Sequence, residues 1–408
     1  MKTNLASKPS DDLPSDWRLV RLGEVSALNP RRPPLERKDE EPTSFVPMPA
    51  VDSYHGTIST PETRPYKDVR KGYTYFEDGD VLFAKITPCM ENGKSAVAHG
   101  LKGGVGFGST EFHVIRPEPE VLPTWIHLYV RQPRVLDEAK NHFTGAVGQQ
   151  RVPASFLSDL EIPLPPLPEQ RRISSLLKKQ FEAVEKARAA VLAQIEDAQS
   201  LAAAFLRHAF PKTGDVLPKG WRWVELREIA TIHPGQHIMA SEYGTDGIGI
   251  GYLTGPADFG ETVPTISKWT KKPKTFSEPG DVLVTVKGAG VGKSNLAPPE
   301  RVAIGRQLMA IRPVDGTSET DFLFYFIRAK MLEISGQALG ATVPGLGRDS
   351  LERLNVPLPR LPEQKRIASL LKKQFEAVER ESKVAQAQLD EIEALPASML
   401  RQAFNGAL

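Results

Sequence analysis

Side chains that can bind phosphates and base edges gather in glycine-bearing turns of this sequence. In the first half, the six candidates are Lys85, Asn92, Lys94, Gln149, Gln150 and Arg151. Lysine and arginine neutralise backbone phosphates, whereas glutamine can pair bidentately with adenine and arginine with guanine. The first three flank a turn after an apolar run, and the last three share the segment GQQR. These residue types therefore predict a contact with nucleic acid.

The second half carries a corresponding set, which consists of Lys268, Lys271, Lys272, Lys287, Lys293, Arg306, Gln307 and Arg348. The first three belong to KWTKKPK, the densest basic run. Lys287 and Lys293 lie in a glycine turn that matches the one in the first half, and Arg348 is expected in the loop equivalent to GQQR. Any one of these charges can be an ordinary solvated side chain, but the groups together favour DNA contact.

The segment GAGVGKS (288–294) imitates a nucleotide-binding phosphate loop but does not fit it. That pattern needs four residues between its first glycine and Gly-Lys-Ser, and Lys287 stands at the first position here. Such a loop also opens into a helix, whereas NLAPPERVAI follows. An NTPase is therefore a weaker alternative than a glycine turn that presents two lysines. GIGIG (247–251) and GVGFG (104–108) are likewise expected to form tight turns with positive φ.

Catalytic and metal-binding patterns are not evident in the sequence. Cys89 is the single cysteine, which excludes an intrachain disulfide and a thiolate-rich zinc site. The eight histidines show no HxxxH or HExxH spacing, and no Ser/His/Asp or paired-carboxylate arrangement stands out. We therefore expect a binding protein without enzymatic activity, metal or cofactor.

Composition and length are those of a soluble globular protein with two or three domains. The chain has 408 residues, of which 40% are hydrophobic and 25% charged, and its net charge is +2. So small a net charge means that DNA binding must come from local basic patches. No run approaches ~18 consecutive apolar residues, and the N-terminal segment lacks the apolar core of a signal peptide. The sequence therefore predicts a cytoplasmic protein with no membrane span.

A sequence unit of about 200 residues occurs twice in the chain. LPEQRRISSLLKKQFEAVEK (167–186) recurs as LPEQKRIASLLKKQFEAVER (361–380), with seventeen of twenty positions identical at an offset of 194 residues. Weaker copies lie upstream: GDVLFAKI (79–86) mirrors GDVLVTVK (280–287), VIRP mirrors AIRP, and WRLVRLGEV mirrors WRWVELREI. A repeat of this length exceeds the 20–50 residues of solenoids. It predicts a duplicated pair of domains related by a pseudo-two-fold axis.

The repeated tails read as long helices that need a partner. Nine positions from Leu177 to Phe205 follow alternating spacings of four and three, and all but Arg188 are apolar, which makes one continuous stripe. A helix of about 40 residues is ~60 Å long, and its most obvious partner is the other tail in a coiled coil. Pro396 stands where the first tail has Ala202, so we expect a kink or break there.

The bodies before each tail are expected to mix helices and strands, which makes the fold class α+β. Apolar β-branched runs predict strands in GDVLFAKI, GDVLVTVK, EFHVIRP and QLMAIRP. PTWIHLYVRQPRVLDEAK and ETDFLFYFIRAKMLEI read as amphipathic helices. The expected domains are a first recognition body at 1–166, a helical spacer at 167–210, a second body at 211–360 and a second helical spacer at 361–408.

The chain resembles the specificity subunit of Type I restriction–modification systems, often called HsdS. The motifs that carry the resemblance are IPLPPLPEQRRI and VPLPRLPEQKRI before the helices, FLRHAF and MLRQAFNGAL at their ends, and GDVLFAKITPCMENGKSA. The resemblance covers nearly all 408 residues. It implies that each body is a target recognition domain for one half of a bipartite asymmetric DNA site. It also implies that two antiparallel helices set the spacing between the half-sites.

The same resemblance implies partners. Two S-adenosylmethionine-dependent methyltransferase subunits (HsdM-like) would bind around the helices, and two restriction–translocase subunits (HsdR-like) would join them on double-stranded DNA. The candidates for methyltransferase contact, or for orienting the helix starts, are Glu169, Gln170, Glu363 and Gln364. The main alternative is a bivalent coiled-coil scaffold whose bodies bind proteins, although such a scaffold has no need of paired basic glycine turns.

Overall fold

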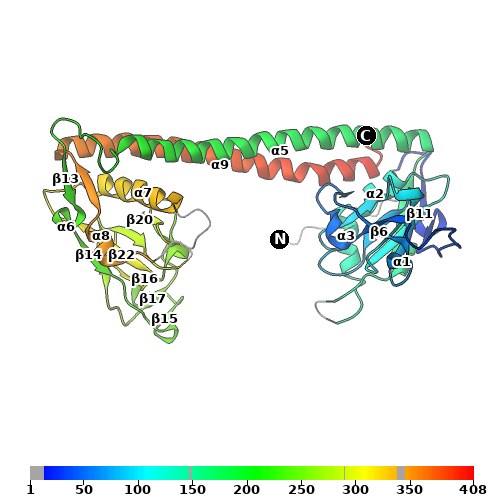
Figure 1. Ribbon diagram of the computed structural model, residues 1–408, viewed down its shortest axis with the longest axis horizontal. Coiled ribbons are helices and arrows are strands. Elements are labelled where there is room, and N and C mark those ends of the chain that lie inside the picture. The colour runs from blue at the N-terminus through cyan, green and yellow to red at the C-terminus, as the bar shows by residue number, and fades with distance from the viewer. Residues whose placement is uncertain (1–12, 147–148, 289, 338–344) are drawn as a thin grey trace. The chain divides into compact units, whose positions relative to one another are not determined.

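The structure is a computed structural model that describes residues 13–146, 149–288, 290–337 and 345–408. It separates into two compact units, Met1–Ala190 with Leu389–Leu408 and Val191–Gln388 (Figure 1). Each unit contains one body and parts of two long helices, α5 (Leu167–Ala209) and α9 (Leu361–Phe404). The predicted α+β fold class is thus confirmed.

The first body is made of two four-stranded sheets with short additions. One sheet has the order β2 (Ser26–Leu28), β11 (Phe112–Pro117), β8 (Val81–Ala84) and β9 (Ser95–Val97). The other has the order β6 (Glu62–Pro65), β3 (Pro42–Val46), β10 (Val105–Gly108) and β7 (Thr74–Glu77). Two-stranded pairs join β1 (Arg18–Arg21) to β12 (Glu161–Leu164) and β4 (Val51–Asp52) to β5 (Thr57–Ile58). The helices of this body are α1 (Tyr66–Val69), α2 (Pro123–Val130), α3 (Pro133–Lys140) and α4 (Ala154–Asp159).

The second body repeats this plan. Its antiparallel sheet has the order β14 (Ala230–Pro234), β22 (Leu308–Pro313), β19 (Val282–Thr285) and β20 (Ser294–Leu296). Its other sheet has the order β15 (Tyr243–Gly244), β17 (Trp269–Thr270), β16 (Ile250–Leu253), β21 (Val302–Ile304) and β18 (Phe276–Ser277). The pair β13 (Arg222–Glu225) and β23 (Asn355–Leu358) corresponds to β1 and β12. The helices are α6 (Leu226–Ile229), α7 (Thr320–Gln337) and α8 (Arg348–Glu352).

One sheet has the same strand order in both bodies, and the other sheet differs between the bodies at one edge. The orders β2-β11-β8-β9 and β14-β22-β19-β20 are equivalent, and both second sheets contain a parallel pair, β3 with β10 and β16 with β21. Next to that parallel pair, the first body adds β6 whereas the second adds β17 and β15. The duplication seen in the sequence is therefore a duplication of topology, and the strand order of the second sheet diverges at this edge.

Most predicted elements are present, and one glycine segment differs. Strands β8, β19, β11 and β22 confirm the four expected strands, while the expected helix after Pro123 is two helices because Pro133 starts a new one. GVGFG was expected to be a turn, but Val105–Gly108 is strand β10. A Cβ on Gly106 would lie 2.5 Å from the Phe76 ring, and one on Gly108 would lie 2.5 Å from the Val46 carbonyl oxygen. These glycines allow close packing within the sheet.

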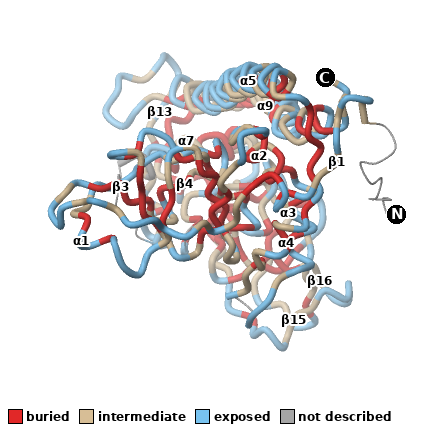
Figure 2. The backbone as a smooth tube through the Cα atoms, turned by 90° about the vertical axis from the view of Figure 1, so that its right-hand side faces the viewer, coloured by how far each residue is buried: buried red, intermediate tan, exposed pale blue. Residues whose placement is uncertain are grey.

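The long helices run antiparallel within each unit. In the first unit, Arg188 of α5 forms an ion pair of 3.3 Å with Glu393 of α9, while Ile173, nearer the start of α5, shares a core cluster with Phe404 at the end of α9. Pro396 does not break α9, which continues to Phe404. Pro396 removes one backbone hydrogen bond, but buried Leu400 and Phe404 after it hold the last turns against the body. Figure 2 shows burial concentrated in the strands, with the outer faces of α5 and α9 exposed.

An aromatic anchor joins each body to the end of a long helix. Phe404 is fully buried, with its ring centroid 4.4 Å from that of Trp125 and 5.0 Å from that of Tyr129 on α2. Phe210, which follows α5, lies 5.5 Å from Phe322 and 5.6 Å from Phe326 on α7 in the same way. The repeated AF at the two helix ends is therefore a repeated packing element.

A buried histidine in α2 predicts that acid destabilises the first unit. Burial, assisted by the nearby Arg131 charge, lowers the pKa of His127 to about 3. Between pH 6.5 and 3 the unfolded chain binds a proton that the folded chain does not, so stability present above pH 6.5 is lost as the pH falls. The expected loss at pH 5 is about 2 kcal/mol, measured by urea unfolding of the intact chain.

The repeat supplies a matched control for this pH dependence. The position equivalent to His127 is Phe324 in α7, which is also buried. His127→Phe should flatten the pH dependence of the first unit between pH 6.5 and 5. The histidines that share this unit and whose pKa is shifted, His113 downward and His55 upward, are unchanged in this variant. An unaltered slope would refute the assignment to His127.

Within the described ranges, no helix is both long enough and apolar enough to cross a membrane.

Candidate nucleic-acid interface

Two loops of the first body lie side by side at the end of strand β8. The first is the turn 85–94, in which Lys85 and Lys94 flank the exposed Asn92 and Gly93 has φ of +69°. The second is the GQQR segment: the amide of Thr87 donates to the carbonyl of Gln150 at 3.0 Å, and Ile86 forms a β-bridge with Arg151. The structure therefore brings the two predicted groups of the first body together. Gly148 lies outside the described residues.

In these two loops, two cationic side chains donate hydrogen bonds to acceptors within the protein. Arg151 donates from Nε and Nη2 to both carboxylate oxygens of Glu111, at 2.9 and 2.8 Å, and its hydrogen bonds lower the pKa of Glu111. Lys94 is partly buried and donates from Nζ to the carbonyl of Met48 at 3.1 Å. Arg151 is thus an anchor of the loop in the free protein rather than a free guanine reader, while Gln149 and Asn92 are exposed.

The second body presents an equivalent turn at the end of strand β19. The amide of Thr285 donates to the carbonyl of Lys293 at 2.8 Å, as the amide of Ala84 does to the carbonyl of Lys94 at 2.9 Å. Lys287, Lys293 and Arg306 are exposed around this turn. The amide group of Gln307 lies against both Gly255 and Gly288, so Gln307 belongs to the same cluster. The turn leads into strand β20 rather than a helix, which argues against a phosphate loop.

Some of the lysines in the basic run KWTKKPK bind acceptors within the protein. Lys268 donates from Nζ to Asp258 and to Thr254, both at 3.1 Å, and Asp258 is buried. Lys272 forms an ion pair of 3.1 Å with Glu242, whereas Lys271 is exposed. The expectation of a basic surface therefore needs correction at Lys268, whose charge balances a buried carboxylate.

Arg348 is not in the position expected from GQQR. The amide of Leu346 donates to the Val286 carbonyl at 3.0 Å, as the amide of Val152 does to the Lys85 carbonyl at 2.9 Å. Leu346 is therefore the counterpart of Val152, and the counterparts of the glutamines fall in 338–344, outside the described residues. Arg348 begins helix α8 and pairs with Glu352 at 2.7 Å.

A buried ion pair supports each sheet that carries these turns, and it explains the repeated GDVL and IRP. In the first body, Arg116 binds both oxygens of Asp80 at 2.8 and 2.7 Å, and in the second, Arg312 binds Asp281 at 2.8 and 2.9 Å. Both aspartates are 1% exposed. The hydrogen bonds that the arginines donate to these aspartates raise the pKa of both arginines. Both motifs are visible in the sequence as repeats, but their pairing across the sheet is not.

The glutamines of LPEQ tie the helix starts to the bodies. Gln170 accepts from the amide of Leu122 at 2.8 Å and donates to the carbonyls of Glu120 and Pro165 at 3.0 and 2.9 Å. Gln364 makes the equivalent bonds in the second unit, and both side chains are buried. Because both glutamines are buried, they have no surface for a methyltransferase contact. Their role is the other expected one, orientation of the helix starts. Glu169 and Glu363 instead pair on the surface with Arg172 and Arg366.

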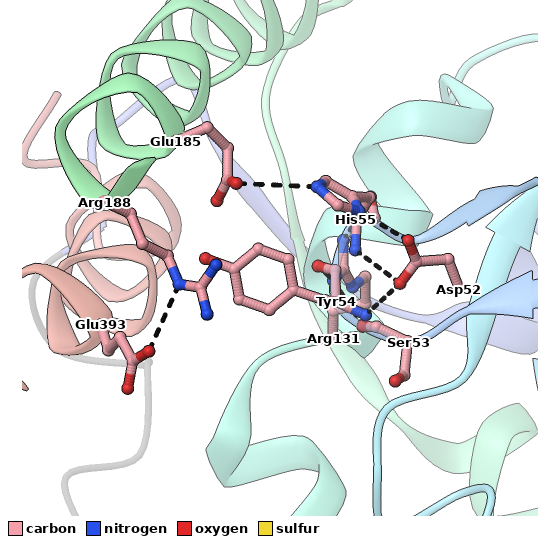
Figure 3. A network of polar contacts seen from close by, with 8 residues as sticks. All are labelled: Asp52, Ser53, Tyr54, His55, Arg131, Glu185, Arg188 and Glu393. Carbon is pink, nitrogen blue, oxygen red and sulfur yellow. Dashed lines mark hydrogen bonds and ion pairs between the residues drawn. The ribbon is translucent and has the colours of Figure 1, made fainter. Parts of the chain in front are cut away.

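A loop between β4 and β5 also connects the first body to both long helices (Figure 3). Arg131 donates to the carbonyls of Ser53 and His55 at 3.0 and 3.2 Å and holds the loop closed. His55 lies between Asp52, at 2.5 Å, and Glu185 of α5, at 3.6 Å, and the hydrogen bond with Asp52 raises the pKa of His55. No local pattern of residues marks this contact in the sequence.

The second unit uses the equivalent helix position differently. The proximity of Glu379 of α9, the counterpart of Glu185, to Glu261 raises the pKa of Glu261 and lowers the pKa of Glu379. Glu379 also forms an ion pair with Lys383. Both bodies therefore contact the same glutamate of the repeated helix, through different side chains.

Comparison with known families gives one match that covers most of the chain. A family model described as the Type I restriction modification DNA specificity domain matches residues 14–196 and again 218–391. The two matches follow the internal duplication.

Among characterised proteins, the chain is similar to several specificity subunits. It is 42% identical to the Type I restriction enzyme EcoEI specificity subunit of Escherichia coli over 169 residues, 41% of this chain and 28% of that protein. The EcoAI subunit matches similarly over 27% of its length, so these alignments span little more than a quarter of either relative. A putative type I restriction enzyme MjaX specificity subunit of Methanocaldococcus jannaschii is 28% identical across 88% of this chain and 87% of that protein.

Solved structures give full-length matches. A chain from a study of complex assembly and conformational transition of the type I R-M system aligns with a TM-score of 0.85 at 31% identity, covering 97% of this chain and 99% of that chain. The HsdS subunit from Thermoanaerobacter tengcongensis aligns with a TM-score of 0.63, also at 31% identity, covering 97% and 98%.

Proposed function

Since this chain belongs to the Type I restriction modification DNA specificity family, we propose that it selects the DNA site on which a Type I complex acts. Each body reads one half of a bipartite, asymmetric site on double-stranded DNA. The chain contributes sequence reading, and its partners contribute the chemistry.

The observation that carries this proposal is the matched pair of turns. Turns 85–94 and 287–293 follow equivalent strands and are supported by equivalent buried ion pairs, yet they present different side chains. The first exposes Asn92 and has exposed Gln149 beside it, whereas the second has exposed Arg306 and the partly exposed Gln307 beside the phosphate-binding candidates Lys287 and Lys293. Equivalent positions with different polar groups are what two readers of unlike half-sites require.

The partners follow from the same proposal. Two methyltransferase subunits that use S-adenosylmethionine dock on the repeated faces of α5 and α9, and two restriction–translocase subunits join the complex. The near-identity of 167–186 and 361–380 supports docking of two copies of one partner. Glu169 and Glu363, which lie on these faces, remain candidates for that contact. The helices also set the number of base pairs between the half-sites.

Mapping of methylated adenines tests the proposal directly. The chain is co-expressed with its methyltransferase partner, and we expect a two-part motif with an unspecified gap of constant length. Exchange of residues 217–358 for the second body of a relative should alter one half of the motif only. A change in both halves, or a motif without a gap, contradicts the division of labour.

Substitution of the exposed turn lysines is expected to weaken binding without changing the sequence that is read. Lys287→Ala with Lys293→Ala removes two phosphate contacts, so the slope of log K against log salt concentration should fall by about 0.9 per contact. The measurement is fluorescence anisotropy of a labelled duplex with the assembled methyltransferase at several salt concentrations. Lys219→Ala, an exposed lysine before the second body, is the control and should leave the slope unchanged.

A protein-binding scaffold is the alternative that these experiments separate. Its association with partners would not depend on a DNA motif, and loss of the turn lysines would leave the salt slope unaltered.

A further inference from the structure

The segment after α9 folds back into a groove of the first unit. Gly406 has φ of +72°, and the amides of Gly406 and Ala407 donate to the carbonyls of Ala403 and Gln402 at 3.4 and 3.0 Å. This is the hydrogen-bond pattern of a Schellman helix end, which needs glycine at the left-handed position. A Cβ on Gly406 would also lie 2.6 Å from Cγ of Pro14. The turn thus directs 406–408 against the start of the first body.

Arg172 holds the end of this segment. Its Nη2 donates to the backbone oxygen of Leu408 at 2.8 Å, while Nε and Nη2 also bind Glu169 at 2.7 Å each. The Leu408 side chain packs on the core cluster that contains Ile173 and Leu177. The groove therefore recognises a small-residue turn, an aliphatic side chain and one backbone oxygen.

The second unit contains the same groove, and none of the residues that the structure describes occupies it as 405–408 occupies the first. A cleft of about 390 Å³ is lined by the counterparts of the first groove, among them Trp221, Arg366, Ile367, Leu370 and Leu371. Arg366 binds Glu363 at 2.8 Å through Nε and Nη2, as Arg172 binds Glu169. Leu370 is 49% exposed, whereas its counterpart Leu176 is partly buried.

The sequence after α5 explains why this groove stays open. Phe210 corresponds to Phe404, but Pro211 follows it where Asn405 follows Phe404, and Pro211 has no amide hydrogen to donate. The linker instead lines a different hollow, beside Phe326 and Lys330 of α7. The chain therefore leaves the second helix end in another direction, and Leu370 and Arg366 remain exposed.

We propose that the groove of the second unit binds a peptide segment of a partner protein. The segment has the chemistry of 405–408: a tight turn of small residues, then an aliphatic side chain over Leu370 and Leu371, with a backbone oxygen that accepts from Arg366. The occupied twin in the first unit supplies the model for this recognition, because the arginine, its glutamate partner and the apolar floor are all repeated.

The test uses a fluorescein-labelled peptide, RQAFNGAL, which corresponds to residues 401–408, titrated with the full chain and followed by anisotropy. We expect saturable one-to-one binding. Arg366→Ala should weaken the affinity roughly tenfold to a hundredfold, as loss of a hydrogen bond from a charged donor does. Leu370→Glu, at an exposed position, should abolish binding while the circular dichroism spectrum stays unchanged.

The first unit provides the matched control. Arg172→Ala lies in the groove that the chain already fills, so it should not weaken binding of the added peptide. If the free acid and the amidated peptide both bind, the recognised oxygen is a carbonyl. If the acid alone binds, the oxygen belongs to a terminal carboxylate. Either result supports peptide binding in this groove. The proposal fails if no peptide binds, if Arg366→Ala and Leu370→Glu have no effect, or if the chain alone dimerises through this groove.

Discussion

Replacement of Phe404 by alanine is expected to lower the free energy of unfolding of the first unit by about 3–5 kcal/mol. Phe404 is fully buried and packs against Trp125 and Tyr129. Its removal leaves a cavity between α2 and the end of α9, and neighbouring side chains fill such a cavity only in part. Hydrogen exchange of the intact chain is the appropriate measurement, since it reports stability separately for peptides from each unit.

The duplicated anchor makes this experiment internally controlled. Phe210→Ala should raise exchange in α7 and its surroundings, because Phe210 packs on Phe322 and Phe326. It should leave α2 protected, and Phe404→Ala should show the reverse pattern. Equal protection of α2 in Phe404→Ala and the parent chain would falsify the anchor role.

Arg116→Met is expected to destabilise the first unit by a similar amount, about 3–5 kcal/mol. The substitution leaves the carboxylate of Asp80, which is 1% exposed, without its bidentate partner. An unpaired buried charge is costly, whereas removal of both charges costs much less. Hydrogen exchange of β8 and β11 in the intact chain measures the effect.

The double variant separates charge from packing in this ion pair. Arg116→Met combined with Asp80→Asn should recover much of the stability lost in Arg116→Met alone. Arg312→Met, its counterpart in the second body, should destabilise β19 and β22 instead. If the double variant is no more stable than the single one, the buried charge is not the cause.

The parts of the fold that depend on short-range pattern were predictable from sequence. The stripe of α5 has a period that only a helix satisfies, and apolar β-branched runs such as Val81–Ala84 are strands. Strand β10 was missed because its glycines serve packing against Phe76, a neighbour that only tertiary structure supplies. A kink or break of α9 was expected at Pro396, but the helix continues to Phe404 because packing of the residues beyond Pro396 outweighs one lost hydrogen bond.

The sequence predicted which loops of the first body lie together, but it did not predict which single side chains are free to bind DNA. The two loops of the first body do come together, because strand pairing places Arg151 beside Ile86. Whether a cation is free depends on carboxylates far away in sequence: Glu111 engages Arg151, and Asp258 engages Lys268. Arg348 was misplaced since the second body has a different loop length before Leu346. Long-range partners of this kind leave no local mark in the sequence.

The contact of Gly406 with Pro14 also indicates where the chain could be cut and rejoined. In the first unit the segment after α9 reaches the start of the first body, and the linker after α5 is open to solvent at Val216, which is 97% exposed. A circular permutant that joins residue 408 to residue 13 and begins within this linker would retain the buried contacts of each unit, so we expect it to fold.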